Sequence, residues 1–172
     1  FNHGELMHAD SIHFPDSLKY QTKKLARTVY GGGGIMPDFF VPIDTTQYTD
    51  YHRNIVAKGV VIKTTMKFIE SHRKELQSKY KKFETFNDKF EISDEILANM
   101  QTLAEQEKIK FDEKQYRKSL PLIKTQLKAL IARDLWDMNE YFQIMNTTDS
   151  SVLQALKVLN EGAYEKVVMK KW

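Results

Sequence analysis

Apolar residues recur at steps of three and four along most of the chain after residue 44, and this spacing limits the possible folds more than any other feature. Such residues form a stripe along one side of an α-helix, which turns once in about 3.6 residues. Stripes this wide must pack on one another or on a partner. The sequence therefore predicts a mainly α fold, a bundle of four to five helices preceded by a short strand and loop segment.

Capping residues and glycines mark the ends of the shorter helices. Residues 44–46, Asp-Thr-Thr, are candidate N-caps for a first short helix, and Gly59 is expected to break or bend the chain after it. Asp149 or Ser150 is expected to cap a last helix that ends near Gly162.

The second predicted helix has an apolar stripe formed by Val61, Thr65, Phe68, Ile69, His72, Leu76, Tyr80 and Phe83.

Two longer helices are predicted in the middle of the chain. Ser93 or Asp94 caps a third helix, and Asp112 with Gln115 resembles a capping box at the start of a fourth. Pro121 is expected to kink the fourth helix or to start it afresh. Its stripe is formed by Tyr116, Leu120, Ile123, Leu127, Leu130, Ile131, Leu135, Met138, Phe142 and Met145.

Residues 1–44 differ in composition from the rest of the chain. They hold five of the seven glycines, Gly4 and Gly31–Gly34, and three of the four prolines. The pieces "SLKYQT", "RTVY" and "FFVPI" have the alternation or the β-branched and aromatic content of short strands. We expect two regions: a strand and loop segment over residues 1–44 and a helical domain over residues 45–172.

The run Gly31–Gly34 raises the question of phosphate binding. A P-loop requires Gly-Lys-Ser/Thr at the start of a helix, whereas Ile35, Met36 and Pro37 follow here. The dinucleotide fingerprint is also absent, since no helical pattern follows the glycines. The run instead favours a tight turn between two strands, and no bound cofactor is expected.

The charge pattern and the absence of cysteine exclude several classes of function. Net charge is +3, with basic residues concentrated in 58–89 and 108–128 and acidic ones in 91–107. We interpret these blocks as solvated helix faces and expect no nucleic-acid partner, although a nucleic-acid surface is the alternative. No apolar stretch approaches the roughly 20 residues that span a bilayer, and disulfides and thiolate ligands are excluded.

Histidines near the N-terminus suggest a metal site only weakly. His3, His8 and His13 recur every five residues with Glu5 and Asp10 between them, which matches neither a helix face nor a strand face. We interpret them as loop histidines, with metal binding as the alternative.

No other residues form a recognisable catalytic pattern. The serines have no Gly-x-Ser-x-Gly framing, and no Glu-x-x-His pair marks a di-metal bundle. His52 and His72 lie on or beside apolar stripes, where a hydrogen-bonded imidazole is the ordinary role. We expect no catalytic, cofactor-binding or metal-binding residue in this chain.

The stretch Asp16–Thr46, "DSLKYQTKKLARTVYGGGGIMPDFFVPIDTT", resembles the C-terminal edge of the protease domain in carboxyl-terminal processing (tail-specific) serine peptidases, especially the exported Bacteroidetes forms. The most specific part is "VYGGGG-I-x-PD". Ala26 is a departure, because the family usually has glycine before this arginine. Residues 45–172 look like the helical tail that follows the core in those proteins.

The resemblance implies a C-terminal fragment, beginning at Phe1, of a serine-type endopeptidase that cleaves protein C-terminal tails. The nucleophilic serine, the lysine base and the PDZ domain would precede this chain, which alone would be inactive. Its partners would be those upstream domains and the parent's protein substrates, with a possible homo-oligomer, in the periplasm or cell envelope. The alternative is a stand-alone helical adaptor that binds proteins.

Overall fold

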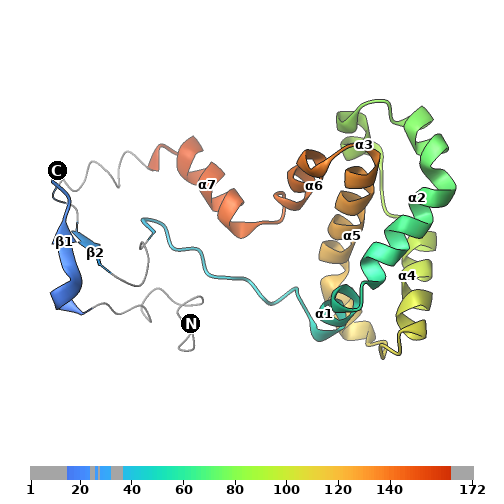
Figure 1. The fold of residues 1–172 in the computed structure, drawn as a ribbon, viewed down its shortest axis with the longest axis horizontal. Coiled ribbons are helices and arrows are strands. Elements are labelled where there is room, and N and C mark those ends of the chain that lie inside the picture. The colour runs from blue at the N-terminus through green and yellow to red at the C-terminus, as the bar shows by residue number, and fades with distance from the viewer. Residues whose placement is uncertain (1–14, 24–25, 27, 32–36, 164–172) are drawn as a thin grey trace. The chain divides into compact units, whose positions relative to one another are not determined.

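The computed structural model describes residues 15–23, 26, 28–31 and 37–163, and these are mainly helical (Figure 1). The prediction of an α bundle preceded by a short strand segment is confirmed. The chain divides into two compact units. One consists of residues 1–44 with 150–172, and the other of residues 45–149. None of the described helices is long and apolar enough to cross a membrane.

Six helices build the second unit (Figure 1): α1 (Asp50–Ala57), α2 (Val60–Lys79), α3 (Phe83–Lys89), α4 (Asp94–Gln106), α5 (Glu113–Leu135) and α6 (Met138–Met145). The long helix α5 packs against α1, α2 and α6, and α2 also packs against α1 and α4. Their apolar stripes meet in one core. The largest side chains that are fully buried there include Ile55, Phe86, Ile96, Met100, Ile123, Leu127 and Ile131.

Aromatic rings fasten α3 to the rest of the second unit. The ring of Phe86 stacks on that of Phe90 at 4.6 Å between centroids and lies 5.3 Å from the ring of Trp136. Tyr80 meets Phe86 edge to face at 5.5 Å, and Phe83 meets Trp136 at 5.9 Å. Offset and edge contacts at such distances add to the stabilisation that burial provides. The short helix α3 therefore depends on tertiary packing more than on its own length.

The first helix begins later than the sequence predicted. Its N-cap is Thr49, whose hydroxyl accepts a hydrogen bond from the His52 N–H, so the proposed caps at residues 44–46 are wrong. The same threonine bonds to Ser119 on α5, a tertiary contact that local capping rules do not include. Gly59 ends α1 and precedes α2 with φ +70°, so the predicted break at that glycine is confirmed.

Each of the two long apolar stripes continues beyond the end of one helix into the next helix. The stripe that ends at Phe83 belongs to α2 only as far as Lys79, because Phe83 starts α3. Helix α5 continues through Pro121 but stops at Leu135, and α6 begins after Asp137, whose carboxylate accepts from the Met138 N–H at 2.5 Å. The prediction of one helix from Tyr116 to Met145 is therefore wrong.

The first unit contains little regular structure among its described residues. A turn of 3-10 helix (Asp16–Leu18) leads into strand β1 (Lys19–Gln21), which pairs antiparallel with β2 (Thr28–Tyr30). Helix α7 (Ser150–Asn160) completes it, and Gly162 follows with φ +60°. The predicted strand in "FFVPI" is absent, since residues 39–43 are irregular and Pro42 supplies no N–H for a ladder.

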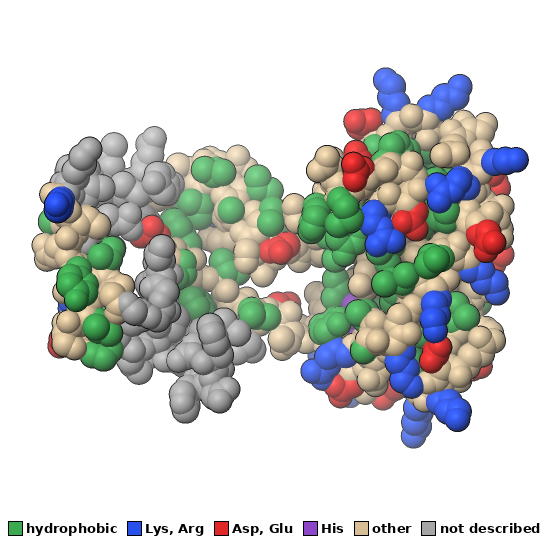
Figure 2. Space-filling view, in the orientation of Figure 1, with side chains coloured by type: hydrophobic (Ala, Val, Ile, Leu, Met, Phe, Trp, Pro, Cys, Tyr) green, Lys and Arg blue, Asp and Glu red, His purple; other side chains and the backbone are tan. Residues whose placement is uncertain are grey.

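Lysine and arginine side chains are spread over the face of the second unit shown in Figure 2, with acidic side chains among them. Several pair directly: Lys63 Nζ lies 2.6 Å from Glu107 Oε1, and Arg117 lies 2.6 Å from Glu113. Three of these side chains are more than half exposed and that of Glu107 is 37% exposed, so each pair contributes little to stability. This arrangement is typical of solvated helix faces.

Candidate functional site

The β1–β2 hairpin is a two-stranded sheet whose side chains are mostly exposed. Lys19 pairs with Tyr30, Tyr20 with Val29 and Gln21 with Thr28. The central pair remains in solvent, with Tyr20 58% and Val29 41% exposed. An isolated hairpin of this kind is marginally stable in water, because it has no covered face. The hairpin is therefore a surface that lacks its packing partner among the described residues.

The turn between the strands contains an unusual backbone conformation at Ala26. Its φ is +45°, and its N–H donates to the carbonyl oxygen of Thr22 at 3.0 Å. A left-handed conformation costs a residue with a Cβ roughly 1–2 kcal/mol, whereas glycine adopts it freely. The position where Ala26 stands is thus one that favours glycine.

Gly31, the first residue of the glycine run, lies under the ring of Tyr20. A Cβ at Gly31 would be 2.8 Å from Tyr20 Cε2, so any other residue there would force the ring to move. The Gly31 N–H donates to the carbonyl oxygen of Leu18 at 2.8 Å and extends the hairpin. Gly32–Gly34 lie outside the described residues, so the exclusion of phosphate binding stays a prediction. The expected turn between two strands is wrong, because residues 37–43 after the run contain no strand.

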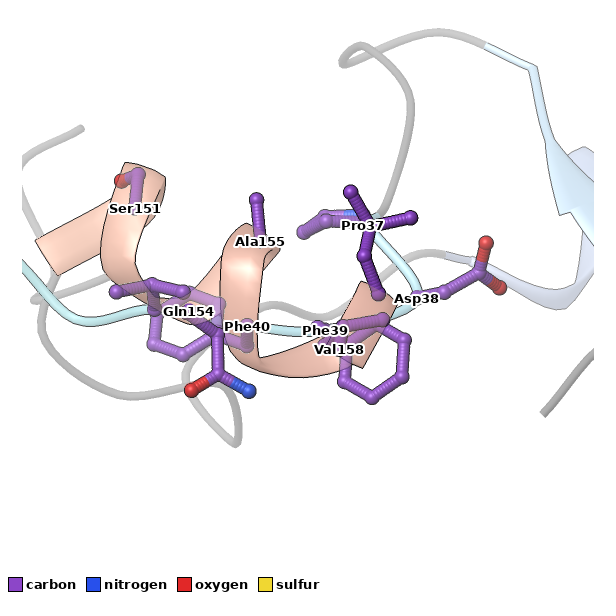
Figure 3. Close-up of a pocket in the computed structure, with 10 residues that line it drawn as sticks. Pro37, Asp38, Phe39, Phe40, Ser151, Gln154, Ala155 and Val158 are labelled. Carbon is purple, nitrogen blue, oxygen red and sulfur yellow. The ribbon is translucent and has the colours of Figure 1, made fainter. Parts of the chain in front are cut away.

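A groove in the first unit separates α7 from residues 37–41 (Figure 3). Its volume is about 590 Å³, within the ~300–1,000 Å³ that ligand pockets commonly have. Val158 is buried there, and most of the other lining side chains are apolar, including Phe39, Phe40, Val41 and Ala155. Such a lining can take apolar side chains.

Helix α7 also exposes a second apolar side. Leu153, Leu156 and Leu159 are between 48% and 69% exposed, and Lys157 is the helix's one charged residue. A contiguous exposed apolar surface on a protein commonly marks an interaction site. The hairpin, the groove and these leucines are the candidate functional surfaces of the first unit.

In the second unit, a buried polar cluster joins the start of α1 to α5. Ser119, fully buried, donates to the carbonyl oxygen of Gln47 at 2.6 Å and accepts from the Thr49 hydroxyl at 2.7 Å. The Tyr51 N–H donates to Gln115 Oε1 at 2.8 Å. The side chain of Gln115 thus accepts a hydrogen bond from α1, while its own backbone N–H donates to the Asp112 carboxylate at 2.9 Å. Of the predicted capping box, the bond from the Gln115 N–H to the Asp112 side chain is therefore formed, whereas Gln115 Oε1 accepts from the Tyr51 N–H instead.

Tyr51 is buried against the rings of Phe111 and Tyr116, at 5.7 and 6.0 Å between centroids. Burial raises the pKa of Tyr51 to about 12, with smaller contributions from Tyr116 and Glu105. The phenol therefore stays protonated at neutral pH, which disfavours a role as a base or nucleophile.

Ser71 and His72 on α2 line a cavity of about 190 Å³ together with Glu95 on α4. Their hydrogen bonds point back along their own helix, since Ser71 Oγ donates to the Lys67 carbonyl at 3.4 Å and His72 Nδ1 to that of Phe68 at 3.0 Å. The imidazole also stacks on the Phe68 ring at 4.4 Å. These contacts give His72 the boundary role expected from the sequence and do not assemble a catalytic triad.

Lys128 on α5 is a partly buried lysine of the helical unit. Its ammonium donates to the Asn87 carbonyl at 2.6 Å and lies 5.9 Å from the centre of the Phe86 ring. Burial lowers the pKa of Lys128, although Glu91 and Asp88 act in the opposite direction. Its hydrogen bond is to the last turn of α3, which makes it a helix-capping lysine.

Metal binding has no support within residues 15–23, 26, 28–31 and 37–163, where no three His, Asp or Glu side chains gather closely enough to hold an ion. The histidines at 3, 8 and 13, with Glu5 and Asp10, lie outside the described residues. Their interpretation as loop residues, with metal binding as the alternative, stays a prediction.

Comparison with known proteins gives one match. The profile of a family of unknown function (DUF8443) matches residues 51–137. The match begins in α1 and ends at Asp137, the N-cap of α6, so it covers helices α1–α5 of the second unit. No curated protein and no solved structure matches the chain significantly.

Proposed function

The chain belongs to the family of unknown function DUF8443, and we propose from its own residues that it is the C-terminal region of a carboxyl-terminal processing serine protease. In this proposal residues 1–44 complete the edge of the peptidase core. The helical unit braces that core, restricts access to it or joins protomers. The chain itself contributes structure, not the nucleophile.

The uncovered hairpin is the observation that carries the proposal. Both strands lie within the stretch that resembles the C-terminal edge of such a core, and the cross-strand pair Tyr20–Val29 is exposed. A larger sheet or a covering layer supplied by a peptidase core would bury these side chains and pair the open strand edges. The hairpin would then obtain its packing from the peptidase core, since it has no core of its own among the described residues.

Ala26 supports the same proposal independently. The resembling peptidases usually have glycine at this position, and here the alanine has φ +45°. A left-handed residue explains why glycine is the ordinary choice. In this proposal, the departure from the family pattern changes the energy of the turn, since alanine takes up the left-handed conformation at a cost that glycine does not have.

The remaining parts of the proposal rest on the resemblance alone. The serine nucleophile, a lysine base whose pKa is lowered beside it, and a PDZ domain would lie earlier in the same polypeptide. Protein C-termini would be the substrates, and the periplasm or cell envelope of a bacterium would be the location. A homo-oligomer built through the helical unit is a further possibility of this arrangement.

The test compares this chain with the longer polypeptide read from the same gene upstream of Phe1. Only the longer protein is expected to cleave an unfolded polypeptide with a free C-terminus, and replacing its upstream catalytic serine with alanine should abolish cleavage. Cleavage by the 172-residue chain, lost on changing one of its own serines, would contradict the proposal. An initiation codon directly before Phe1 would contradict it as well.

A substitution in the hairpin tests the structural part directly. Val29→Asp should leave the unfolding midpoint of the isolated chain unchanged, because Val29 is exposed, but should lower that of the longer protein, where the strand would be covered. Met66→Asp on α2, also an exposed apolar position, is the matched control and should change neither midpoint. Equal responses of the two proteins to Val29→Asp would argue against a covered hairpin.

The exposed leucines of α7 favour a second candidate, a free-standing adaptor that binds proteins. Changing Leu153 and Leu156 to serine should then abolish binding to a protein partner without affecting the helical unit. Binding to oligonucleotides that falls steeply as salt rises would instead point to nucleic acid.

A further inference from the structure

His52 has an unusual environment for a residue near a helix start. It is 1% exposed, and its Nε2 lies 3.0 Å from Oε1 of Gln126 on α5. An amide oxygen only accepts hydrogen bonds, so Nε2 carries the proton and donates. The other ring nitrogen, Nδ1, is then an unprotonated acceptor, and it is buried without a hydrogen-bond partner among the described residues.

Protonation of this ring is unfavourable in the folded unit. A second N–H would appear at Nδ1, together with a positive charge inside the unit. The groups facing the ring are neutral: the amide of Gln126, and the ring of Tyr48, whose centroid lies 4.7 Å from that of the imidazole. The charged neighbours on α1, Asp50 and Arg53, are exposed and pair with each other.

Burial lowers the pKa of His52, and the hydrogen bond to Gln126 offsets only part of that effect. The opened state, with an exposed imidazole of pKa near 6.5, therefore binds the proton more readily than the closed state. The closed form therefore has its full stability above about pH 6.5 and loses stability as the pH falls below that value.

The other contacts between α1 and α5 are neutral hydrogen bonds. They join Thr49 to Ser119 and the backbone of Tyr51 to Gln115, and none of them changes charge in mild acid. His52 is thus the titratable member of this connection. Helix α1 follows the exposed residues 42–47, so its detachment would lengthen that connecting segment by the eight residues of the helix.

We propose that His52 is an acid-sensitive latch, which holds α1 on α5 when the imidazole is neutral and releases it when the ring takes up a proton. The device is a property of the helical unit and does not depend on the proposed function. It would let mild acid release α1 and lengthen the segment that leads into the helical unit, while the core of α2, α4 and α5 stays folded.

The test is amide hydrogen exchange of the full chain at several pH values, corrected for the intrinsic exchange rates. The opening constant of the α1 amides should rise by up to tenfold for each pH unit below about 6.5, since one proton is taken up on opening. The amides of α4 should not follow. In His52→Gln the rise should disappear, whereas His72→Gln, the matched control on α2, should keep it.

A second variant keeps the test decisive if His52→Gln folds poorly. Gln126→Glu places a carboxylate beside the ring, which favours the imidazolium, so α1 should stay protected in mild acid. Equal loss of protection in α1 and α4 of the unaltered chain would overturn the latch in favour of global acid unfolding. An unchanged response to pH in both His52→Gln and Gln126→Glu would overturn it too.

Discussion

The two units of the molecule differ in how far their apolar residues are buried. Residues 45–149 enclose a continuous core around α5, whereas among the described residues of the first unit Val158 is the one buried side chain. That smaller unit nevertheless carries six of the twelve large hydrophobic side chains that are exposed: Tyr20, Val29, Ile43, Leu153, Leu156 and Leu159. The helical unit therefore encloses an apolar core of its own, whereas the described residues of the first unit leave most of their apolar side chains exposed.

The reason lies in the kind of secondary structure each unit contains. Six helices bury their stripes on one another, and burial stabilises by about 25 cal/mol per Å² of apolar surface. Two three-residue strands bury almost nothing, because a sheet needs a covering layer for its apolar face. The comparison predicts that equivalent substitutions have very different effects in the two units.

The largest effect is expected from Phe86→Ala in the helical unit. Phe86 is fully buried between Tyr80, Phe90 and Trp136, and removing its ring leaves a cavity where α3 meets α5, at an expected cost of about 3–5 kcal/mol. Urea unfolding followed by far-UV circular dichroism measures this loss.

The matched control for the core substitution is Leu159→Ala in α7. Leu159 is largely exposed, so the change should stay within about 0.5 kcal/mol. A comparable loss from both substitutions would mean that the first unit is as well packed as the second, and the contrast between them would fail.

An intermediate effect is expected at the junction where the chain enters the helical unit. Ser119→Ala removes the hydroxyl that satisfies the Gln47 carbonyl and Thr49, so it should cost about 1–3 kcal/mol. Thr125→Ala on the same helix, whose exposed hydroxyl bonds only the Pro121 carbonyl, should cost much less. Equal costs would show that the buried cluster does not fix α1, and would weaken the latch as well.

Much of the helical unit follows from the sequence, because amphipathic stripes and caps are local signals. Ser93 and Asp112 cap their helices as predicted, through bonds to the N–H groups of Ile96 and Gln115. The apolar pattern did not predict the helix ends at Lys79 and Leu135, because the residues on both sides of each end pack into the core. Phe83 and Trp136 remain packed against each other, so the apolar spacing continues where the helix does not.

The candidate site was less predictable, since it depends on residues far apart in the chain. Alternation in SLKYQT and the β-branched and aromatic content of RTVY predicted the two strands of the hairpin, but no local pattern indicates that their faces stay exposed. The groove brings residues 37–41 against α7, more than a hundred positions later in the sequence. His52 was expected to be a hydrogen-bonded imidazole on or beside an apolar stripe, whereas only the structure shows that Nε2 bonds to Gln126 and that the buried Nδ1 has no partner among the described residues.

The smallest effect, and the one that bears most closely on the hairpin, is expected from Ala26→Gly. Glycine relieves the strain of φ +45° but loses more freedom on folding, so a net gain of at most about 1 kcal/mol is expected, confined to the hairpin. Amide exchange of Val29 and Gly31 measures it. Ala98→Gly, in the middle of α4 and exposed, is the same substitution in a helix and should destabilise by about 1 kcal/mol. If Ala26→Gly weakens the hairpin instead, the turn does not require a left-handed residue, and the link to the glycine of the resembling peptidases is lost.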